Sequence, residues 1–338
     1  MRKYSIFFLS LLFLSSLSFT SCKKDDTSED ETLYMEGTLI YTLSGYLTAF
    51  QEVELKATGI TTPATGATYK WYTTGFGVDS IIGESVKIIA PGGYGDYSVI
   101  LTVSHPDYAS KTLSKTTVVI NPSVEGSYSG TIKGPGSFTD TRDGKVYNFK
   151  QYDKLYWFTS NLQWEGAGKA YNNEKALAPI YGVLYTWNQA TGGVSKSGLG
   201  NGPKGVCPDG WSVPTKEDWE NLGTALKGSP VVFDSNWATL GEIASANAKL
   251  NGTSIWKYSP NNLKNNILGW NALPGGSSSN NFKSFANISQ FGFWWSSSQK
   301  DSNNGEYRFI HFDTSDFPYN FGDKAYLGAN VRCVKLVQ

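Results

Sequence analysis

Three cysteines and two histidines are the residues of this chain best suited to covalent or acid–base chemistry. Cys207 and Cys333 lie in the C-terminal part of the chain, and Cys22 lies near its start. A nucleophilic or redox-active cysteine needs a base or a charged neighbour that lowers the pKa of its thiol. His105 precedes a proline in a loop-like stretch and His311 falls in an alternating, strand-like segment, so we assign neither as a base. We therefore predict that the chain is not an enzyme and has no catalytic residue.

The N-terminus indicates export and a lipid anchor. Two basic residues precede an apolar run from Ser5 to Phe19, which is too short for a comfortable membrane span, so residues 1–21 are predicted to be a signal peptide. The run ends in Phe-Thr-Ser-Cys, which resembles the bacterial lipobox, where the signal is cut before a cysteine that then carries the lipid. We predict lipidation of Cys22 and attachment to a membrane through it. An ordinary secretory signal is the alternative.

Residues 22–33 are predicted to form an acidic tether. Lys-Lys-Asp-Asp follows Cys22 directly, and three more acidic residues precede residue 33. A charged run with few apolar side chains cannot bury enough surface to offset the entropy lost on ordering. The run also resembles the acidic export signal of surface lipoproteins in Bacteroidetes-type outer membranes. We therefore predict an outer-membrane, lipid-anchored protein that faces the cell exterior.

Cys207 and Cys333 both follow the export signal, in the part of the chain that meets an oxidising compartment. An even pair of cysteines in such a compartment most simply forms a disulfide. A disulfide that closes a loop of this length would stabilise the fold by about 4 to 5 kcal/mol. A redox or nucleophilic pair is the alternative, and it would require free thiols.

Metal ions, cofactors and nucleic acids are not predicted partners. The chain has 29 Lys plus Arg and 29 Asp plus Glu, with no basic stripe to supply the charge that dominates nucleic-acid binding. Asp140 and Asp143 could act as calcium ligands, but their loop lacks the alternating oxygen donors of calcium loops. Zinc ligands are too few at any usual spacing. We predict no metal site and no cofactor.

Residues 34–121 are predicted to form an all-β domain, because short alternating runs are separated by turn residues and no helical period intervenes. Alternate residues from Tyr97 to Val103 share one face, and Trp71 lies in an earlier strand and is predicted to pack in the core. The pattern resembles PKD-type and immunoglobulin-like sandwiches, and such a domain near an anchor acts as a spacer. A Gly-, Ser- and Pro-rich run predicts a linker over 122–137. The strands are expected at roughly 37–43, 51–57, 67–74, 85–90, 96–104 and 111–120.

The stretch from Cys207 to Leu222 combines a turn, a short strand and a helix start. Thr215 and Asp218 have the spacing of a capping box, and a glycine and a proline stop the helix after residue 227. A second helix is predicted over about 237–250, and strands occupy much of the remainder. We expect this stretch to act as scaffold rather than to touch a ligand.

The C-terminal part of the chain contains seven motifs in this order: DGKVY, WFTSNL, YGVLYTW, VCPDGWSVPTKEDW, NALPGG, FWWSSS and VRCVK. In their order, over about 138–336, they resemble the Fibrobacter succinogenes major paralogous domain family. That family is similar to the C-type-lectin-like fold, including its formylglycine-generating-enzyme branch. The resemblance implies that residues 138–338 form an α+β C-type-lectin-like domain with a twisted antiparallel sheet and two helices.

The resemblance does not carry known chemistry to this chain. Calcium-dependent lectins use a Glu-Pro-Asn type loop and a Trp-Asn-Asp strand, and the comparable places here are Leu-Pro-Gly at 273–275 and Trp-Asn-Gln at 187–189. A calcium-dependent sugar site is therefore not implied. The enzyme branch needs a cysteine pair beside its substrate groove, whereas Cys207 and Cys333 are predicted to form the disulfide.

Tryptophan side chains are the predicted ligand contacts, since their broad rings suit sugars and protein partners. We select Trp270, Trp294 and Trp295, and strand alternation predicts that at most one of the last two faces inward. The long loops after Thr191 and after Pro274 are rich in Asn, Ser and Gly. We expect a non-catalytic, lipid-anchored cell-surface binding or adhesion protein whose ligand is a glycan or a protein. The alternatives are a structural or assembly component of an outer-membrane complex and an enzyme of the formylglycine-generating branch.

Overall fold

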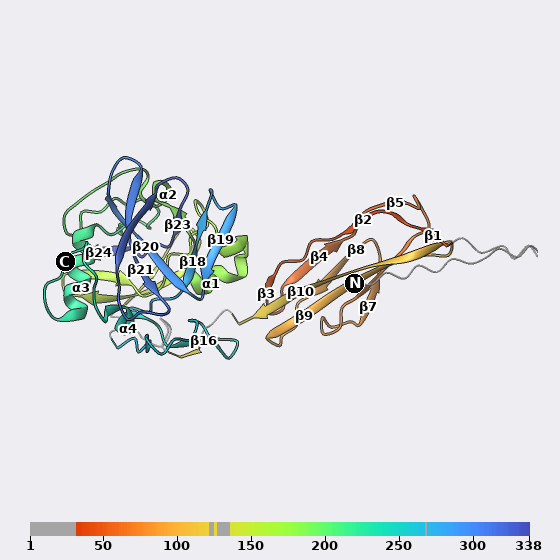
Figure 1. Cartoon of the computed structure of the whole chain (residues 1–338), viewed down its shortest axis with the longest axis horizontal. Coiled ribbons are helices and arrows are strands. Elements are labelled where there is room, and N and C mark those ends of the chain that lie inside the picture. The colour runs from red at the N-terminus through yellow and green to blue at the C-terminus, as the bar shows by residue number, and fades with distance from the viewer. Residues whose placement is uncertain (1–31, 122–124, 127–135, 268) are drawn as a thin grey trace, which may run out of the picture.

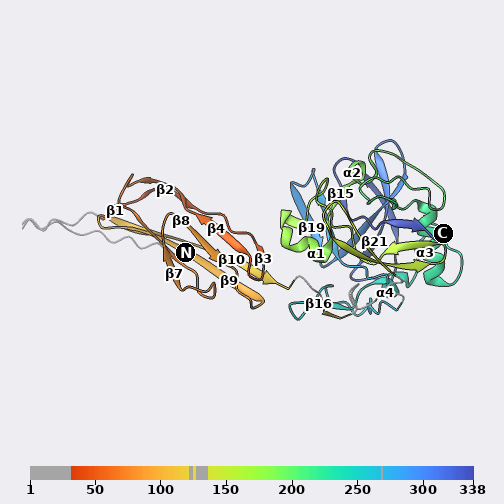
Figure 2. The same ribbon diagram turned by 180° about the vertical axis from the view of Figure 1, so that it is seen from behind.

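The computed structural model describes residues 32–121, 125–126, 136–267 and 269–338 of the 338-residue chain. The predicted signal peptide, the lipidation site at Cys22 and nearly all of the predicted tether lie outside these residues. The chain is mostly β, with several sheets and a few short helices, arranged as two units that lie end to end (Figures 1 and 2). No helix in the described part is long and apolar enough to cross a membrane.

The N-terminal unit consists of one six-stranded sheet and two two-stranded sheets around a single core. The large sheet has the order β1-β10-β9-β6-β7 with β3 also paired to β10, and the small sheets are β2-β5 and β4-β8. All six predicted strands are present, as β2, β4, β6, β8, β9 and β10, and the short strands β1, β3, β5 and β7 were not predicted. The strands are β1 (Leu33–Tyr34), β2 (Glu36–Ile40), β3 (Tyr46–Thr48), β4 (Glu52–Lys56), β5 (Thr58–Thr62), β6 (Thr68–Tyr72), β7 (Ser80–Ile82), β8 (Ser85–Ile89), β9 (Gly95–His105) and β10 (Tyr108–Ile120).

Trp71 occupies the centre of this core, as predicted. Its ring is fully buried and makes an edge-on contact with Tyr41 at 5.1 Å between ring centroids. Val99, Leu101 and Val103 of β9 are buried on the same side of the large sheet because alternate residues of a strand share a face. The alternation visible in the sequence thus identifies the residues of β9 that pack in the core.

The C-terminal unit is built on a seven-stranded sheet with the order β15-β23-β18-β20-β21-β22, to which β19 adds beside β18. A four-stranded sheet, β12-β13-β14-β24, and a small sheet, β11-β16-β17, complete its β structure. The strands are β11 (Glu125–Gly126), β12 (Gly136–Thr139), β13 (Val146–Tyr152), β14 (Leu155–Phe158), β15 (Tyr185–Thr186), β16 (Ala248–Leu250), β17 (Thr253–Ser254), β18 (Gly275–Ser279), β19 (Ser284–Ile288), β20 (Phe291–Gln299), β21 (Asn304–His311), β22 (Tyr319–Asp323), β23 (Gly328–Ala329) and β24 (Val334–Leu336).

Short helices flank these sheets. The longest, α3, begins at the predicted capping box, where Thr215 accepts from the backbone N–H of Asp218 and Asp218 accepts from that of Thr215. It ends at Gly228, whose positive φ of 76° suits glycine. The helices are α1 (Ala178–Tyr181), α2 (Trp187–Thr191), α3 (Lys216–Lys227) and α4 (Leu240–Ala244), with 3-10 turns η1 (Tyr171–Asn173) and η2 (Lys175–Leu177).

The second predicted helix, over 237–250, is wrong in extent. Only α4 is helical, and Ser245 is already extended because it forms a β-bridge with Ala272. Ala248, which the helical period placed on the same face, begins β16 and pairs with β11 instead. Tertiary pairing therefore overrides the apolar spacing after residue 244.

Two cores cover the two faces of strand β20. Trp294 packs in one core with Trp270 and with Trp219 of α3, and Trp295 packs in the other beside Cys207. Both β20 tryptophans are 0% exposed. The prediction that at most one of them faces inward is wrong, because the strand alternates as expected but the chain covers both faces of the sheet.

The two units contact each other through the turn before β3 and the end of β10. The backbone N–H of Gly45 donates to Glu174 Oε1 at 2.8 Å. The Asn251 side chain accepts from the N–H of Asn121 at 3.1 Å and donates to the carbonyl of Val119 at 2.9 Å. The β16–β17 hairpin that carries Asn251 thus holds the last strand of the N-terminal unit.

Candidate functional site

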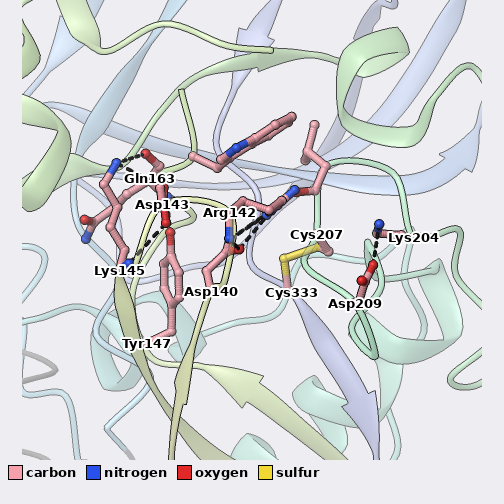
Figure 3. Close-up of polar contacts among 12 residues, drawn as sticks. Asp140, Arg142, Asp143, Lys145, Tyr147, Gln163, Lys204, Cys207, Asp209 and Cys333 are labelled. Carbon is pink, nitrogen blue, oxygen red and sulfur yellow. Dashed lines mark hydrogen bonds and ion pairs between the residues drawn. A yellow bond between two sulfur atoms is a disulfide. The ribbon is translucent and has the colours of Figure 1, made fainter. Parts of the chain in front are cut away.

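The predicted disulfide between Cys207 and Cys333 is present, with a Cα–Cα distance of 5.8 Å (Figure 3). Both cysteines are 0% exposed and lie in a core with Val213 and Val331. The bond joins the segment before α3 to the segment before β24, which are separated by 126 residues in sequence. A buried disulfide in an apolar core is a structural element and offers no reactive thiol.

Asp140 and Arg142 fasten the β12–β13 turn beside this disulfide (Figure 3). The Arg142 guanidinium donates to the buried Asp140 carboxylate at 2.6 Å and to the carbonyl of Val206 at 2.9 Å, and it stacks on Trp164 at 4.2 Å. Burial acts to raise the pKa of Asp140, but the hydrogen bonds from Arg142 outweigh it and lower that pKa. The Asp140 carboxylate is therefore occupied by a guanidinium and is not a calcium ligand.

The three tryptophans predicted to contact a ligand are all in the core. Trp270, Trp294 and Trp295 are each 0% exposed. The Trp294 indole donates to Asn161 Oδ1 at 2.8 Å and the Trp295 indole donates to the carbonyl of Tyr185 at 2.7 Å. The prediction that they form a ligand platform is wrong, because aromatic rings enclosed on every side stabilise the fold and present no face to a ligand.

The two histidines of the described residues lie far apart in the fold. His105 lies at the end of β9 and His311 at the end of β21, in different units. The His311 ring packs against Phe291 at 4.3 Å, and burial lowers its pKa. Among the residues that the structure describes, no group of three or more His, Cys, Asp or Glu side chains is placed to hold a metal ion.

One hollow lies in the N-terminal unit and is lined mainly by apolar side chains. Its volume is about 540 Å³, and Phe50, Phe76, Ile88 and Ile89 contribute to its walls. Specific ligand sites combine apolar walls with several placed polar groups. Lys87 is the one charged side chain in this lining, so the hollow lacks the groups that would select a polar ligand.

A better candidate lies in the C-terminal unit, in the segment between β17 and β18, and we call it the loop pocket. Its volume is about 280 Å³. The Tyr258 ring at its rim is 82% exposed and Leu263 is 68% exposed. The lining combines this aromatic ring with hydroxyl, amide and ammonium groups. It consists of Asn247, Ser254, Trp256, Lys257, Tyr258, Ser259, Asn262, Leu263 and Lys264.

Hydrogen bonds order the segment around the loop pocket. The Lys264 ammonium donates to the carbonyls of Asn262 and Phe312 at 2.8 and 3.0 Å. The Asp313 carboxylate accepts from the Ser259 hydroxyl and from Asn261 Nδ2. Burial lowers the pKa of Lys264 to about 8, so this ammonium is easier to deprotonate than a solvated one. Hydrogen bonds thus fix the polar groups of the loop pocket in place beneath its exposed apolar side chains.

The sequence reasoning missed the loop pocket. It favoured the loops after Thr191 and after Pro274, whereas the pocket lies between those loops in sequence. The overlooked signal is the composition of residues 257–267, KYSPNNLKNNI, in which Tyr, Ser and Asn are interspersed with single aliphatic residues. Binding loops of antibodies share this mixture of rigid aromatic rings and adaptable polar side chains.

Comparison with known proteins places the C-terminal unit in a sequence family. The family model described as the Fibrobacter succinogenes major domain matches residues 144–335, which is more than half of the chain. The match includes the disulfide, helix α3 and the loop pocket. No curated protein matches the chain significantly.

Proposed function

The chain belongs to the Fibrobacter succinogenes major domain family, and from that premise we propose that it is a lipid-anchored, outward-facing binding or adhesion protein. Cys22 carries the lipid in this proposal, and the N-terminal unit acts as a PKD- or immunoglobulin-like spacer. The C-terminal unit, with a C-type-lectin-like arrangement, is the binding head. The protein sits in the outer membrane and faces the cell exterior.

The loop pocket is the observation that carries this proposal. A folded protein in water rarely leaves large apolar side chains exposed together without a use for them. Tyr258 and Leu263 are exposed at the pocket, and Ile267 is 70% exposed a few residues further along the same segment. The polar groups below them, including Lys264 and Ser259, supply the directional contacts that specificity needs. A surface glycan or an exposed protein segment fits this combination.

The arrangement of the two units supports a spacer role for the first. They lie end to end, with β1, the first strand, at the end of its unit that is far from the C-terminal unit (Figure 1). A hydrogen bond that Glu174 accepts and one that Asn251 donates join them, so the head would be held away from an anchor at residue 22. Protease treatment of intact cells tests the outward orientation, and complete protection of the protein would contradict it.

Binding is tested with the chain from residue 23 onward on a glycan array and in pull-downs from cell-surface material. Tyr258→Ala should reduce capture at least tenfold because it removes the most exposed aromatic ring of the pocket. Tyr326→Ala is the matched control, since Tyr326 is 57% exposed but does not line the loop pocket. Equal loss in both variants, or no capture on array and pull-down, would contradict the proposal.

A structural or assembly role in an outer-membrane complex is the second candidate, and the exposed aliphatic side chains Leu263 and Ile267 favour it. A photo-crosslinking amino acid at position 263 would then trap one stable partner of the same membrane in living cells. Transient crosslinks to external ligands would favour binding instead. The formylglycine-branch alternative requires free thiols at Cys207 and Cys333, and these two cysteines are joined in the disulfide.

A further inference from the structure

A β-bulge interrupts the pairing of β20 with β21 at the three serines of the Phe-Trp-Trp-Ser-Ser-Ser run. Trp295 lies opposite Tyr307, but the next paired residues are Gln299 and Gly305. Residues 296–298 therefore oppose the single residue Glu306. Bulges of this kind redirect side chains and are frequent beside functional sites.

The bulged residues of β20 hydrogen-bond to the start of α3. The N–H of Ser297 donates to the carbonyl of Pro214 at 2.7 Å, and the Ser298 hydroxyl accepts from the N–H of Lys216 at 3.1 Å. The bulged strand thus hydrogen-bonds to the helix start instead of to β21. Glu306 consequently has no residue of β20 paired directly opposite it.

Glu306 is left as an unpaired carboxylate in a hollow. Its side chain is half-buried, and within the described residues no group donates a hydrogen bond or forms an ion pair to it. Burial raises its pKa, and the nearby positive charges of Lys216 and Lys300 act against that rise. A partly desolvated carboxylate without protein donors can still accept hydrogen bonds, so a ligand that supplies donors would be favoured here.

The hollow around Glu306, which we call the bulge pocket, has a volume of about 240 Å³ and a predominantly polar lining. Lys196 and Lys216 are exposed at it and form no ion pair among the residues that the structure describes. Gln299 accepts from Lys324 through its oxygen, which leaves its amide N–H groups as donors. The lining consists of Ser195, Lys196, Ser197, Lys216, Ser298, Gln299 and Glu306.

We propose that the bulge pocket binds one neutral sugar ring through neighbouring hydroxyl groups. Glu306 can only accept hydrogen bonds when ionised, and Lys196 and Lys216 can only donate them. A hydroxyl group does both at once, so adjacent hydroxyls can donate to the carboxylate while accepting from an ammonium. An anionic ligand would meet the Glu306 carboxylate, and a cationic ligand would meet the two lysines.

The size of the bulge pocket limits the ligand to a single ring. Sites for drug-sized molecules have volumes of roughly 300 to 1,000 Å³, and this hollow is smaller, at about 240 Å³. Glu306 lies on β21, whereas the loop pocket is formed by the segment between β17 and β18, and the two linings share no residue. The sugar site is therefore independent of the function proposed for the loop pocket.

The test uses the chain from residue 23 onward and methyl pyranosides of the gluco, galacto and manno series, observed by saturation-transfer NMR and titration. At least one glycoside should bind saturably, and its fully O-methylated derivative should not, because it has no hydroxyl to donate. Glu306→Gln and Lys196→Met should each weaken binding about tenfold or more. Glu165→Gln and Lys283→Met are the matched controls, since neither residue lines the pocket, and they should leave affinity unchanged.

Melting temperatures show whether each variant is folded, and Lys196 lies on an exposed loop where substitution should not disturb the core. The proposal is overturned if no glycoside binds, if the methylated derivative binds equally well, or if folded Glu306→Gln and Lys196→Met variants retain full affinity. It is also overturned if only charged sugars bind. Loss of glycoside binding in Tyr258→Ala but not in Glu306→Gln would assign the sugar to the loop pocket instead.

Discussion

Removing the Cys207–Cys333 disulfide should destabilise the C-terminal unit strongly without altering its binding chemistry. The bond spans 126 residues. The loop-entropy relation gives about 4 to 5 kcal/mol for a loop of this length. A change of 1 kcal/mol shifts the melting temperature of a domain of this size by about 2–4 °C, so we expect a decrease of about 8–20 °C. The substitutions Cys207→Ala and Cys333→Ala are combined, because alanine places no polar group in a site that is 0% exposed.

Tryptophan fluorescence during urea unfolding is the assay, since ten of the 11 tryptophans lie after residue 138. Reduction of the unaltered protein should produce the same loss as the double variant. Ellman titration of the native chain from residue 23 onward should find no free thiol. A decrease in the free energy of unfolding below about 1 kcal/mol would refute the structural role of the bond. Two reactive thiols in the native protein, or lost ligand binding at full stability, would refute it as well.

Four further predictions concern single residues. Burial lowers the pKa of Lys264 to about 8, so a ligand held by its ammonium should bind more weakly as the pH rises from 7 to 9, and Lys264→Met should remove that dependence. Burial raises the pKa of Asp218 to about 6 against 3.8 unfolded, so the folded state binds more protons between these values. The free energy of unfolding should therefore fall as the pH rises from about 4 to 6, and Asp218→Asn should lose that fall in urea titrations at each pH. Trp294→Ala should cost about 3–5 kcal/mol in urea unfolding, and an unchanged stability would contradict its core position. Asn251→Gly removes two hydrogen bonds between the units, and glycine tolerates the φ of 48° at this position. The distribution of distances between spin labels on the two units should therefore be broader than in the unaltered protein.

Several features were predictable because they depend on few residues. The capping box at Thr215 and Asp218 acts over three positions, and the structure contains both of its hydrogen bonds. The buried position of Trp71 follows from strand alternation together with the size of the ring. The pairing of Cys207 with Cys333 needed no geometry, because only these two cysteines remain once Cys22 is assigned to the predicted lipid anchor.

Predictions failed where distant segments decide the environment of a residue. Strand alternation correctly puts Trp294 and Trp295 on opposite faces, but it contains no information on whether a second layer covers each face. Apolar spacing favoured a helix through residue 250, but the pairing of Ser245 with Ala272 and of β16 with β11 made that segment extended.

The sequence by itself was therefore enough to predict an export signal. It also determined the family, the turn and helix start at 207–222 and which two cysteines form the disulfide. Only the tertiary structure decided which side chains face solvent. The loop pocket forms because residues 254–264 pack against the end of β21, and the bulge pocket forms because Ser297 and Ser298 hydrogen-bond to the start of α3 instead of to β21. Both depend on hydrogen bonds between segments about 50 to 80 residues apart in the chain, and local residue preferences do not encode such contacts.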